Sequence, residues 1–333
     1  MVKITFKNVG QGDSIIIEWT EDGLNRIGII DCNVYLNTNP VIEHIKELKT
    51  QEIEFLIMSH PHMDHFSGFK QLLDFCIEND IKINRFLHTA LSTPDYLKSA
   101  TYSIDEESKL IDLFNLLNDL EINNLINVYS IDSNPNIQIP LGQEFKMEIL
   151  SPSSREINKY IKGEKYPFNE EKNGNPNANW LSTLFKIYNK EVNILLTSDV
   201  ENGVLKRIGK RKGGRLGKGK IILAQSPHHG SKRNLNKPFW QMRKRNRTTP
   251  IVISVGKNRY NHPSEEVINF FSSLNNYDIY RTDIDYQGIK QSNQAIDNSN
   301  FLDMFSEQNV TVGQISFKDR IYEIIGKNIN IIN

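Results

Sequence analysis

Five short apolar runs, each followed at once by polar side chains, constrain the fold of this 333-residue chain more than any other feature. The runs cover residues 26–30, 53–58, 193–198, 220–225 and 251–255. Short runs rich in β-branched residues predict strands that are buried on both faces. Amphipathic helical patterns at 69–76, 104–122 and 265–274 alternate with them, which indicates a layered α/β architecture. Five strands that deliver polar residues from their ends predict one shared site at one edge of the sheets.

The densest polar group follows the second run, in the segment 59–67. Three of the chain's eight histidines and one aspartate stand there within six positions: His60, His62, Asp64 and His65. Neutral imidazole and carboxylate are ligands that zinc, manganese and iron accept. Four such side chains on one short turn give the geometry for two neighbouring ions. The segment therefore predicts a metal site.

The formal net charge of zero conceals a strong asymmetry. Residues 202–260 contain 17 Lys or Arg and no acidic residue, which leaves 23 basic residues against all 40 acidic ones elsewhere. The densest parts are 206–220 and 243–247. A positive region on a neutral protein attracts polyanions, although a basic loop can also serve solubility alone. Because this region brackets other polar motifs, we expect it to contact nucleic acid or another phosphodiester substrate.

The remaining composition favours a single cytoplasmic domain. No apolar run approaches the 18 to 20 residues that roughly span a bilayer, so we expect no membrane contact. The chain opens into a strand-like segment rather than a signal peptide, and its two cysteines cannot form a disulfide framework. We predict one domain over residues 1–333, with a helical or loop insertion around 94–178. Protein partners are not readable from the sequence.

The motif His60-x-His62-x-Asp64-His65, with Asp31 upstream and Asp199 downstream, resembles the metallo-β-lactamase superfamily. More narrowly, the chain resembles the soluble domain of ComEC-type DNA-uptake competence proteins, through segments 8–14, 196–199, 227–232, 254–263 and 280–283. This resemblance implies a four-layer αββα sandwich with mixed sheets. It does not carry over DNA uptake, because the membrane channel of those proteins has no counterpart here.

The resemblance also implies a ligand set for two divalent ions, zinc or manganese (Zn²⁺ or Mn²⁺), that share a hydroxide. Its members are His60 and His62 for the first ion, Asp64 and His65 for the second, Asp199 as the bridge, and His229, rather than His228, to complete the second site. Asp31 is expected to fix the ring of a ligand histidine.

The third ligand of the first ion is open. Many members of the superfamily supply a histidine between the main cluster and the bridging aspartate, and His88 is the only one in that interval. Asn179, in the segment 179–182, is the alternative that the competence-type pattern suggests. A weaker ligand there would leave the first ion labile and would open the site to manganese as well as zinc.

Four residues in loops after the strands are predicted to bind substrate phosphate: Lys232, Asn258, Tyr260 and His262. Asp64, Lys232 and His262 are the predicted catalytic residues. The favoured function is a metal-dependent phosphodiesterase or nuclease that cleaves DNA or RNA. The alternatives are a small-molecule hydrolase, acting on a lactone, thioester or cyclic nucleotide, and a catalytically degenerate nucleic-acid-binding module.

Overall fold

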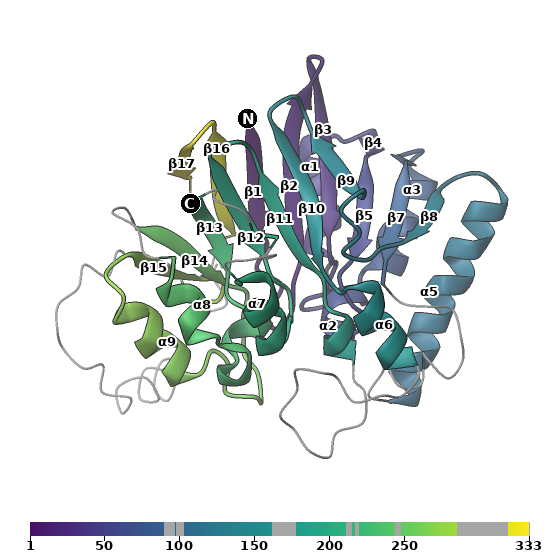
Figure 1. Ribbon diagram of the computed structural model, residues 1–333. Coiled ribbons are helices and arrows are strands. Elements are labelled where there is room, and N and C mark those ends of the chain that lie inside the picture. The colour runs from purple at the N-terminus through teal and green to yellow at the C-terminus, as the bar shows by residue number, and fades with distance from the viewer. Residues whose placement is uncertain are drawn as a thin grey trace, which may run out of the picture.

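Two β-sheets pack face to face in the computed structural model, with helices on their outer faces (Figure 1). The structure describes residues 1–89, 97, 103–161, 178–210, 215–216, 220–243, 248–284 and 319–332. Within them, the first sheet has the order β17 (Asn328–Ile331), β16 (Arg320–Ile325), β1 (Val2–Phe6), β2 (Ile15–Glu21), β3 (Leu24–Ile30), β5 (Phe55–Met58), β7 (Arg85–His88) and β8 (Asn127–Ser130). The second has the order β15 (Tyr277–Arg281), β14 (Thr249–Ile253), β13 (Lys220–Gln225), β12 (Val192–Leu196), β11 (Leu184–Tyr188), β10 (Phe145–Ser151) and β9 (Gln138–Leu141). A small extra pair joins β4 (Glu52–Ile53) to β6 (Lys82–Ile83).

The described helices are short, apart from one of 19 residues, α5 (Ile104–Ile122). The others are α1 (Pro40–Leu48), α2 (Met63–Phe66), α3 (Phe69–Glu78), α6 (Ser154–Ile161), α7 (Asn202–Ile208), α8 (Lys237–Gln241) and α9 (Glu265–Ser272). Three 3₁₀ turns complete the set: η1 (Ala178–Leu181), η2 (His228–Gly230) and η3 (Lys232–Asn234). The patterns at 69–76, 104–122 and 265–274 are thus helices, as predicted. No helix in the described part of the chain is both long and apolar enough to cross a bilayer.

Alternation of side chains along the strands divides the buried residues into an inner and an outer core. In β5, Phe55 and Ile57 belong to the inner core, together with Phe185 and Ile194 of the second sheet. Leu56 and Met58 point the other way and join the helix-facing core. On the outside of the first sheet, the ring of Phe69 in α3 packs against that of Phe86 in β7, with the centroids 5.1 Å apart. The structure confirms the four-layer αββα sandwich.

Both sheets are mixed, and their parallel parts position the polar motifs. Strands β3, β5, β7 and β8 are parallel neighbours, as are β12, β13, β14 and β15. Parallel neighbours end at the same edge of a sheet, so the segments that follow β3, β5, β12, β13 and β14 gather at one end of the sandwich.

The region 94–178 contributes to both sheets. It supplies β8 to the first sheet and β9 and β10 to the second. The helix α5 packs beside α3, and α6 lies against η1. Residues 94–96, 98–102 and 162–177 of the predicted insertion lie outside the described residues, and the single-domain assignment stays a prediction.

The loop that joins β1 to β2 crosses the short helix α2 without room for a side chain at Gly12. The N–H of Asp13 donates to the carbonyl of Asp64 at 3.1 Å, and the side chain of Asn33 donates to the carbonyls of Val9 and Gln11 at 3.1 and 2.9 Å. Gly12 has φ +134°, and a Cβ there would collide with the Asp64 carbonyl oxygen and the Asn33 amide. Glycine is therefore required by both conformation and space.

We predict that Gly12→Ala destabilises the fold by more than about 3 kcal/mol, because backbone strain of about 1–3 kcal/mol adds to the collision. Gly23→Ala is the matched control. Gly23 also has a positive φ, +78°, but nothing lies within 4 Å of the position that a Cβ would take there. It should lose only about 1–2 kcal/mol. Equal losses for the two variants in urea unfolding would contradict the close approach at Gly12.

Candidate metal centre

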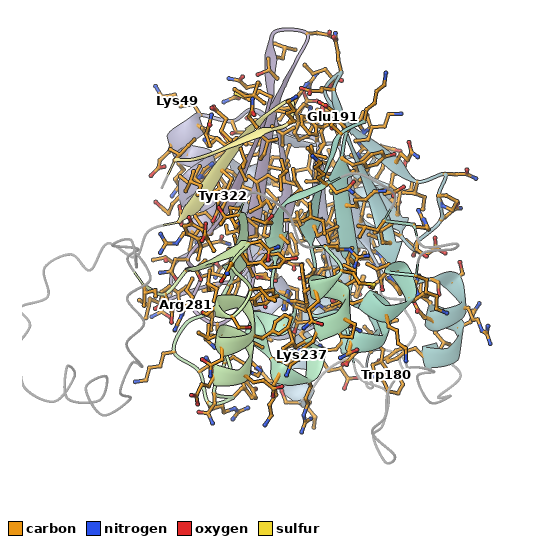
Figure 2. The ribbon with its side chains drawn as sticks, turned by 60° about the vertical axis from the view of Figure 1, so that its left-hand side comes forward. Lys49, Trp180, Glu191, Lys237, Arg281 and Tyr322 are labelled. Carbon is orange, nitrogen blue, oxygen red and sulfur yellow. The ribbon has the colours of Figure 1, made fainter. Side chains whose placement is uncertain are left out.

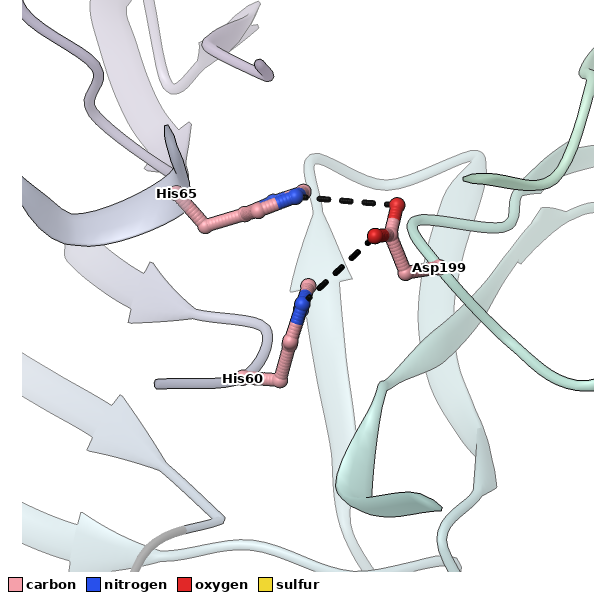
Figure 3. Close-up of side chains that lie close together, drawn as sticks. All are labelled: His60, His65 and Asp199. Atoms are coloured by element: carbon pink, nitrogen blue, oxygen red, sulfur yellow. Dashed lines mark ion pairs between the residues drawn. The ribbon is translucent and has the colours of Figure 1, made fainter. Parts of the chain in front are cut away.

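The carboxylate of Asp199 lies between two histidines from the opposite sheet (Figure 3). His60 follows β5, and His65 lies in α2, while Asp199 follows β12 of the second sheet. Oδ2 of Asp199 is 3.7 Å from His60 Nε2, and Oδ1 is 3.6 Å from His65 Nε2. All three side chains are almost fully buried. The N–H of Asp199 donates to Ser182 Oγ at 2.9 Å, which fixes the loop that carries it.

Asp64 and His229 join one side of this carboxylate. His229 Nε2 is 3.5 Å from Asp199 Oδ1 and 3.4 Å from Asp64 Oδ2. The buried atoms His65 Nε2, Asp199 Oδ1 and His229 Nε2 have no hydrogen-bond partner in the described part of the chain. Zinc bonds of 2.0–2.1 Å in a tetrahedral site place ligand atoms about 3.3 Å apart. Asp64, His65 and His229 lie close enough together to hold one divalent ion, and Asp199 Oδ1 lies beside the two histidines. We call these four side chains the second site.

The outer nitrogens of two of these histidines have acceptors that hold the rings in place. His65 Nδ1 donates to Asp31 Oδ2 at 2.8 Å, and His229 Nδ1 donates to the carbonyl of Ser254 at 2.8 Å. Asp31 also accepts from the N–H and the hydroxyl of Ser59, each at 2.7 Å. A proton on Nδ1 leaves the Nε2 lone pair directed into the second site, as ligation requires.

The other carboxylate oxygen faces a first site that contains His60 and His62. His60 Nε2 lies 3.1 Å from His62 Nδ1. His228 also reaches this oxygen, with Nε2 3.5 Å from Asp199 Oδ2. The side-chain amide of Asn179 lies against the far side of the His228 ring, 3.3 Å from Nδ1.

His88, the other candidate for the first ion, ends β7 in an aromatic environment. Its ring packs edge-on against Phe114 of α5, with the centroids 5.0 Å apart, and against Phe86 at 6.2 Å. The structure thus brings Asn179 to the centre and places His88 in the helix-facing layer.

Burial and neighbouring charges set the protonation of the cluster. Burial lowers the pKa of His60, and it lowers that of His62 to about 4, so both imidazoles are neutral at pH 7. Burial also acts to lower the pKa of His229, but Asp199 and Asp64 outweigh it and raise the pKa to about 9. Asp199 keeps a pKa well below its usual range, because the surrounding histidines overcome the effect of burial. The second site therefore carries protons that a bound cation would displace.

Asp13 and Gln225 belong to the centre, although neither was among the predicted site residues. Gln225 Nε2 donates to both carboxylate oxygens of Asp13, at 2.9 and 2.8 Å. Its Oε1 accepts from the N–H groups of Thr197 and Ser198, both at 2.9 Å. Asp13 can meet Asp199 and His229 at a common ion. The segment 8–14 was the available signal for Asp13, but spacing alone did not show that its loop crosses α2.

Three of the four predicted substrate residues share the loop after β14, whereas Lys232 lies in η3. The ring of His262 lies edge-on to that of His228, with the centroids 5.6 Å apart, and stacks on Tyr260 at 6.0 Å. Asn258 instead bonds within its own loop: its amide donates to the carbonyls of Gly256 and His262 and accepts from two N–H groups. Lys232 is exposed in η3, and its charge acts on Glu266 of α9.

The described part of the basic region is partly neutralised by acids from elsewhere in the chain. Its ion pairs are Arg207 with Glu156 at 3.0 Å, Arg215 with Glu148 at 3.6 Å, and Lys237 with Glu266 at 2.7 Å. Residues 211–214, 217–219 and 244–247 lie outside the described residues.

Part of this region also lies away from the ligands. The N–H of Lys220 donates to the carbonyl of Glu191 at 3.1 Å, and Figure 2 shows Glu191 at the opposite end of the sandwich from Trp180 of η1 and Lys237 of α8. Five residue steps along β13, about 17 Å, separate Lys220 from Gln225. Proximity of the basic run to the motifs in sequence therefore does not place Lys220 beside them in space.

Comparisons with known proteins give similarity at the level of solved structures. No protein-family profile and no curated protein matches the chain. The metallo-β-lactamase fold protein YhfI from Bacillus subtilis is 9% identical over 86% of this chain and 98% of its own, with a TM-score of 0.45. Zn²⁺-bound PqqB from Methylobacterium extorquens is 8% identical over 85% and 99%, with a TM-score of 0.46. A diphosphatase of the PhnP family is 10% identical over 86% and 98%, with a TM-score of 0.43.

The solved structures to which the chain is similar thus include metallo-β-lactamase fold proteins and a metal-dependent hydrolase of that superfamily. At these identities and TM-scores the similarity adds nothing to the chemistry of the site, which rests on the residues described above.

We predict that Asp31→Asn weakens zinc binding about 10- to 100-fold, the usual cost of losing the partner of a ligand histidine. An amide can present N–H to His65 Nδ1 and so favour the ring tautomer whose Nε2 is protonated. Asp74→Asn, on the exposed face of α3, is the control and should bind as the wild type does. Competition with a chromophoric chelator measures both affinities, and an unchanged affinity in Asp31→Asn would contradict the role of this contact.

Proposed function

We propose that this chain is a metal-dependent phosphodiesterase that cleaves DNA or RNA. The observation that carries the proposal is the buried Asp199 carboxylate, which presents one oxygen to each of two clusters of ligand-type side chains. Two divalent ions in such an arrangement supply Lewis acidity toward phosphoryl oxygens and lower the pKa of water.

The centre is accessible on the side of Asp64 and His228. The side chain of Asp64 is 34% exposed and that of His228 is 26% exposed, whereas His60 and His65 have no exposure. A substrate therefore approaches past Asp64 and His228, on the side where His228 packs against His262. Asp64 is then the ligand carboxylate nearest to the reacting group.

His262 and Tyr260 form the outer wall of this approach. His262 Nδ1 is buried and has no hydrogen-bond partner among the described residues. Burial and the neighbouring His228 and His229 lower the pKa of His262 to about 4, so its neutral ring can hydrogen-bond a phosphate oxygen or accept a proton at neutral pH. Tyr260 is 54% exposed and its hydroxyl accepts from Arg259 at 3.3 Å. An exposed aromatic ring beside a cation suits a nucleotide base and its phosphate.

One observation favours a second candidate, a hydrolase of small phosphodiesters or esters. Several described cations of the basic region are paired with acids, and Lys220 lies at the far end of β13. A small substrate needs only the centre and the wall of His262 and Tyr260. Cyclic nucleotides, lactones and thioesters are therefore the comparison substrates.

We predict metal-dependent cleavage of labelled linear and circular DNA or RNA by metal-stripped protein to which zinc or manganese is restored. Asp64→Ala and His62→Ala should each lose the activity, because each removes a predicted ligand. Asp74→Ala, a surface change on α3, should keep it. Intact polymers after incubation with protein that holds two ions would refute the nuclease. Turnover of the small substrates under those conditions would instead establish the second candidate.

We also predict that Tyr260→Ala raises KM for single-stranded substrate about 5- to 150-fold, since stacking contributes about 1–3 kcal/mol per base. Tyr260→Phe keeps the ring and should keep the KM. Tyr129→Ala, at another exposed tyrosine (52%) on β8, is the position control. Equal KM values for Tyr260→Ala and the wild type would remove Tyr260 from the substrate site.

A further inference from the structure

We propose that His228 is the third imidazole of the first site and that Asn179 positions its ring. The inference deepens the proposed function, on whose two-ion centre it rests. The sequence offered His88 and Asn179 as the missing ligand of the first ion. The structure places His88 among aromatic rings and brings a different histidine to the open position.

The two adjacent histidines of η2 face different oxygens of the Asp199 carboxylate. His229 Nε2 faces Oδ1 at 3.5 Å, on the side of the second site. His228 Nε2 faces Oδ2, also at 3.5 Å, and this is the oxygen that His60 Nε2 faces at 3.7 Å. His60 and His228 thus each direct Nε2 toward the same carboxylate oxygen, and His62 lies beside His60.

An unusual backbone makes this double contact possible. In an extended chain, side chains of adjacent residues point to opposite sides. Here His228 and His229 both have left-handed backbone angles, with φ of 49° and 52°, and their rings stand edge-on with centroids 5.9 Å apart. The N–H of His228 donates to the carbonyl of Ser198 at 2.9 Å, next to Asp199. Non-glycine residues are uncommon in this region, which costs conformational energy.

Asn179 contacts the ring of His228 from behind. Its amide lies 3.3 Å from His228 Nδ1, on the side of the ring opposite the Nε2 that faces Asp199. Ligation through Nε2 requires a proton on Nδ1 and hence an acceptor beside it. The amide supplies that acceptor when Oδ1 is turned toward the ring, because the two ends of an Asn amide exchange by a half-turn.

The different hydrogen-bond partners of His65 and His228 predict that the two sites differ in their affinity for metal. His65 is held by the carboxylate of Asp31, whereas His228 has a neutral amide as its partner. A carboxylate makes the ligand ring more basic than an amide does. The side chain of His228 is also 26% exposed, against 1% for His229. The first ion is therefore the one that exchanges and is lost first.

The test measures bound metal rather than activity. Wild type, His228→Ala, His229→Ala and His88→Ala are loaded with zinc, dialysed, and analysed for metal per chain, and cobalt-loaded samples are compared by visible absorption. We expect two ions in the wild type and in His88→Ala, and one in His228→Ala, with the absorption of the second site retained. Two ions at unchanged affinity in His228→Ala, or the loss of one in His88→Ala, would overturn the assignment. Circular dichroism shows whether each variant is folded.

Asn179 is tested by a conservative replacement. Asn179→Asp keeps an acceptor at His228 Nδ1 and should hold the first ion at least as tightly as the wild type. Asn179→Leu removes the acceptor and should weaken that ion about 10- to 100-fold. Equal weakening in the two variants would show that Asn179 does not act through the ring. Loss of the ion from Asn179→Leu together with its retention in His228→Ala would make Asn179 the ligand.

The metal measurements and the nuclease assay test different claims, and either can fail without the other. A wild type that holds two ions but leaves DNA and RNA intact would refute the nuclease and leave the role of His228 in place. A His228→Ala variant that holds two ions and has the zinc affinity of the wild type would refute this role and leave the nuclease in place.

Discussion

Polar side chains from both halves of the sandwich meet at the Asp199 carboxylate. His60 and His65 reach it from the first sheet, and His228 and His229 reach it from the same sheet as Asp199 itself. Because side chains alternate along a strand, a shift of one residue in register would exchange the inner and outer faces. The chemistry at Asp199 therefore depends on the packing of the inner core, including Phe55 and Phe185, which sets how the sheet ends meet.

The concentration of acidic groups at this point gives a physical reason for a cation. Asp13, Asp31 and Asp199 are almost fully buried, and Asp64 is two-thirds buried. Buried carboxylates destabilise a fold unless they are paired or hydrogen-bonded. Asp31 and Asp13 have N–H and O–H donors, but Asp199 Oδ1 faces ring nitrogens without a hydrogen bond. A divalent ion at this oxygen supplies the missing charge, and its affinity for the folded chain would add to the free energy of unfolding.

Much of this arrangement can be predicted from the sequence, because the spacing of apolar residues and the positions where strands end are set by nearby residues. The runs before Asp31, His60 and Asp199 are strands, and the layered class follows from their alternation with helices. The role of His228 was not readable, since it depends on two left-handed residues in succession at 228–229. The internal bonding of Asn258 and the crossing of the loop at Gly12 likewise arise from backbone geometry that no spacing encodes.

The sequence likewise does not show where the charges of the basic region lie in space. Parallel strands run in the same direction, so the residues that precede them lie at one end of the sheet and the residues that follow them lie at the other. Lys220 begins β13 and Gln225 ends it, about 17 Å away by the rise per residue, and the two histidines follow Gln225. A nucleic acid seated at the centre would need about five base steps to cover that distance, at about 3.4 Å per step. Under the proposed function, charge at that end therefore acts on long substrates and not on short ones.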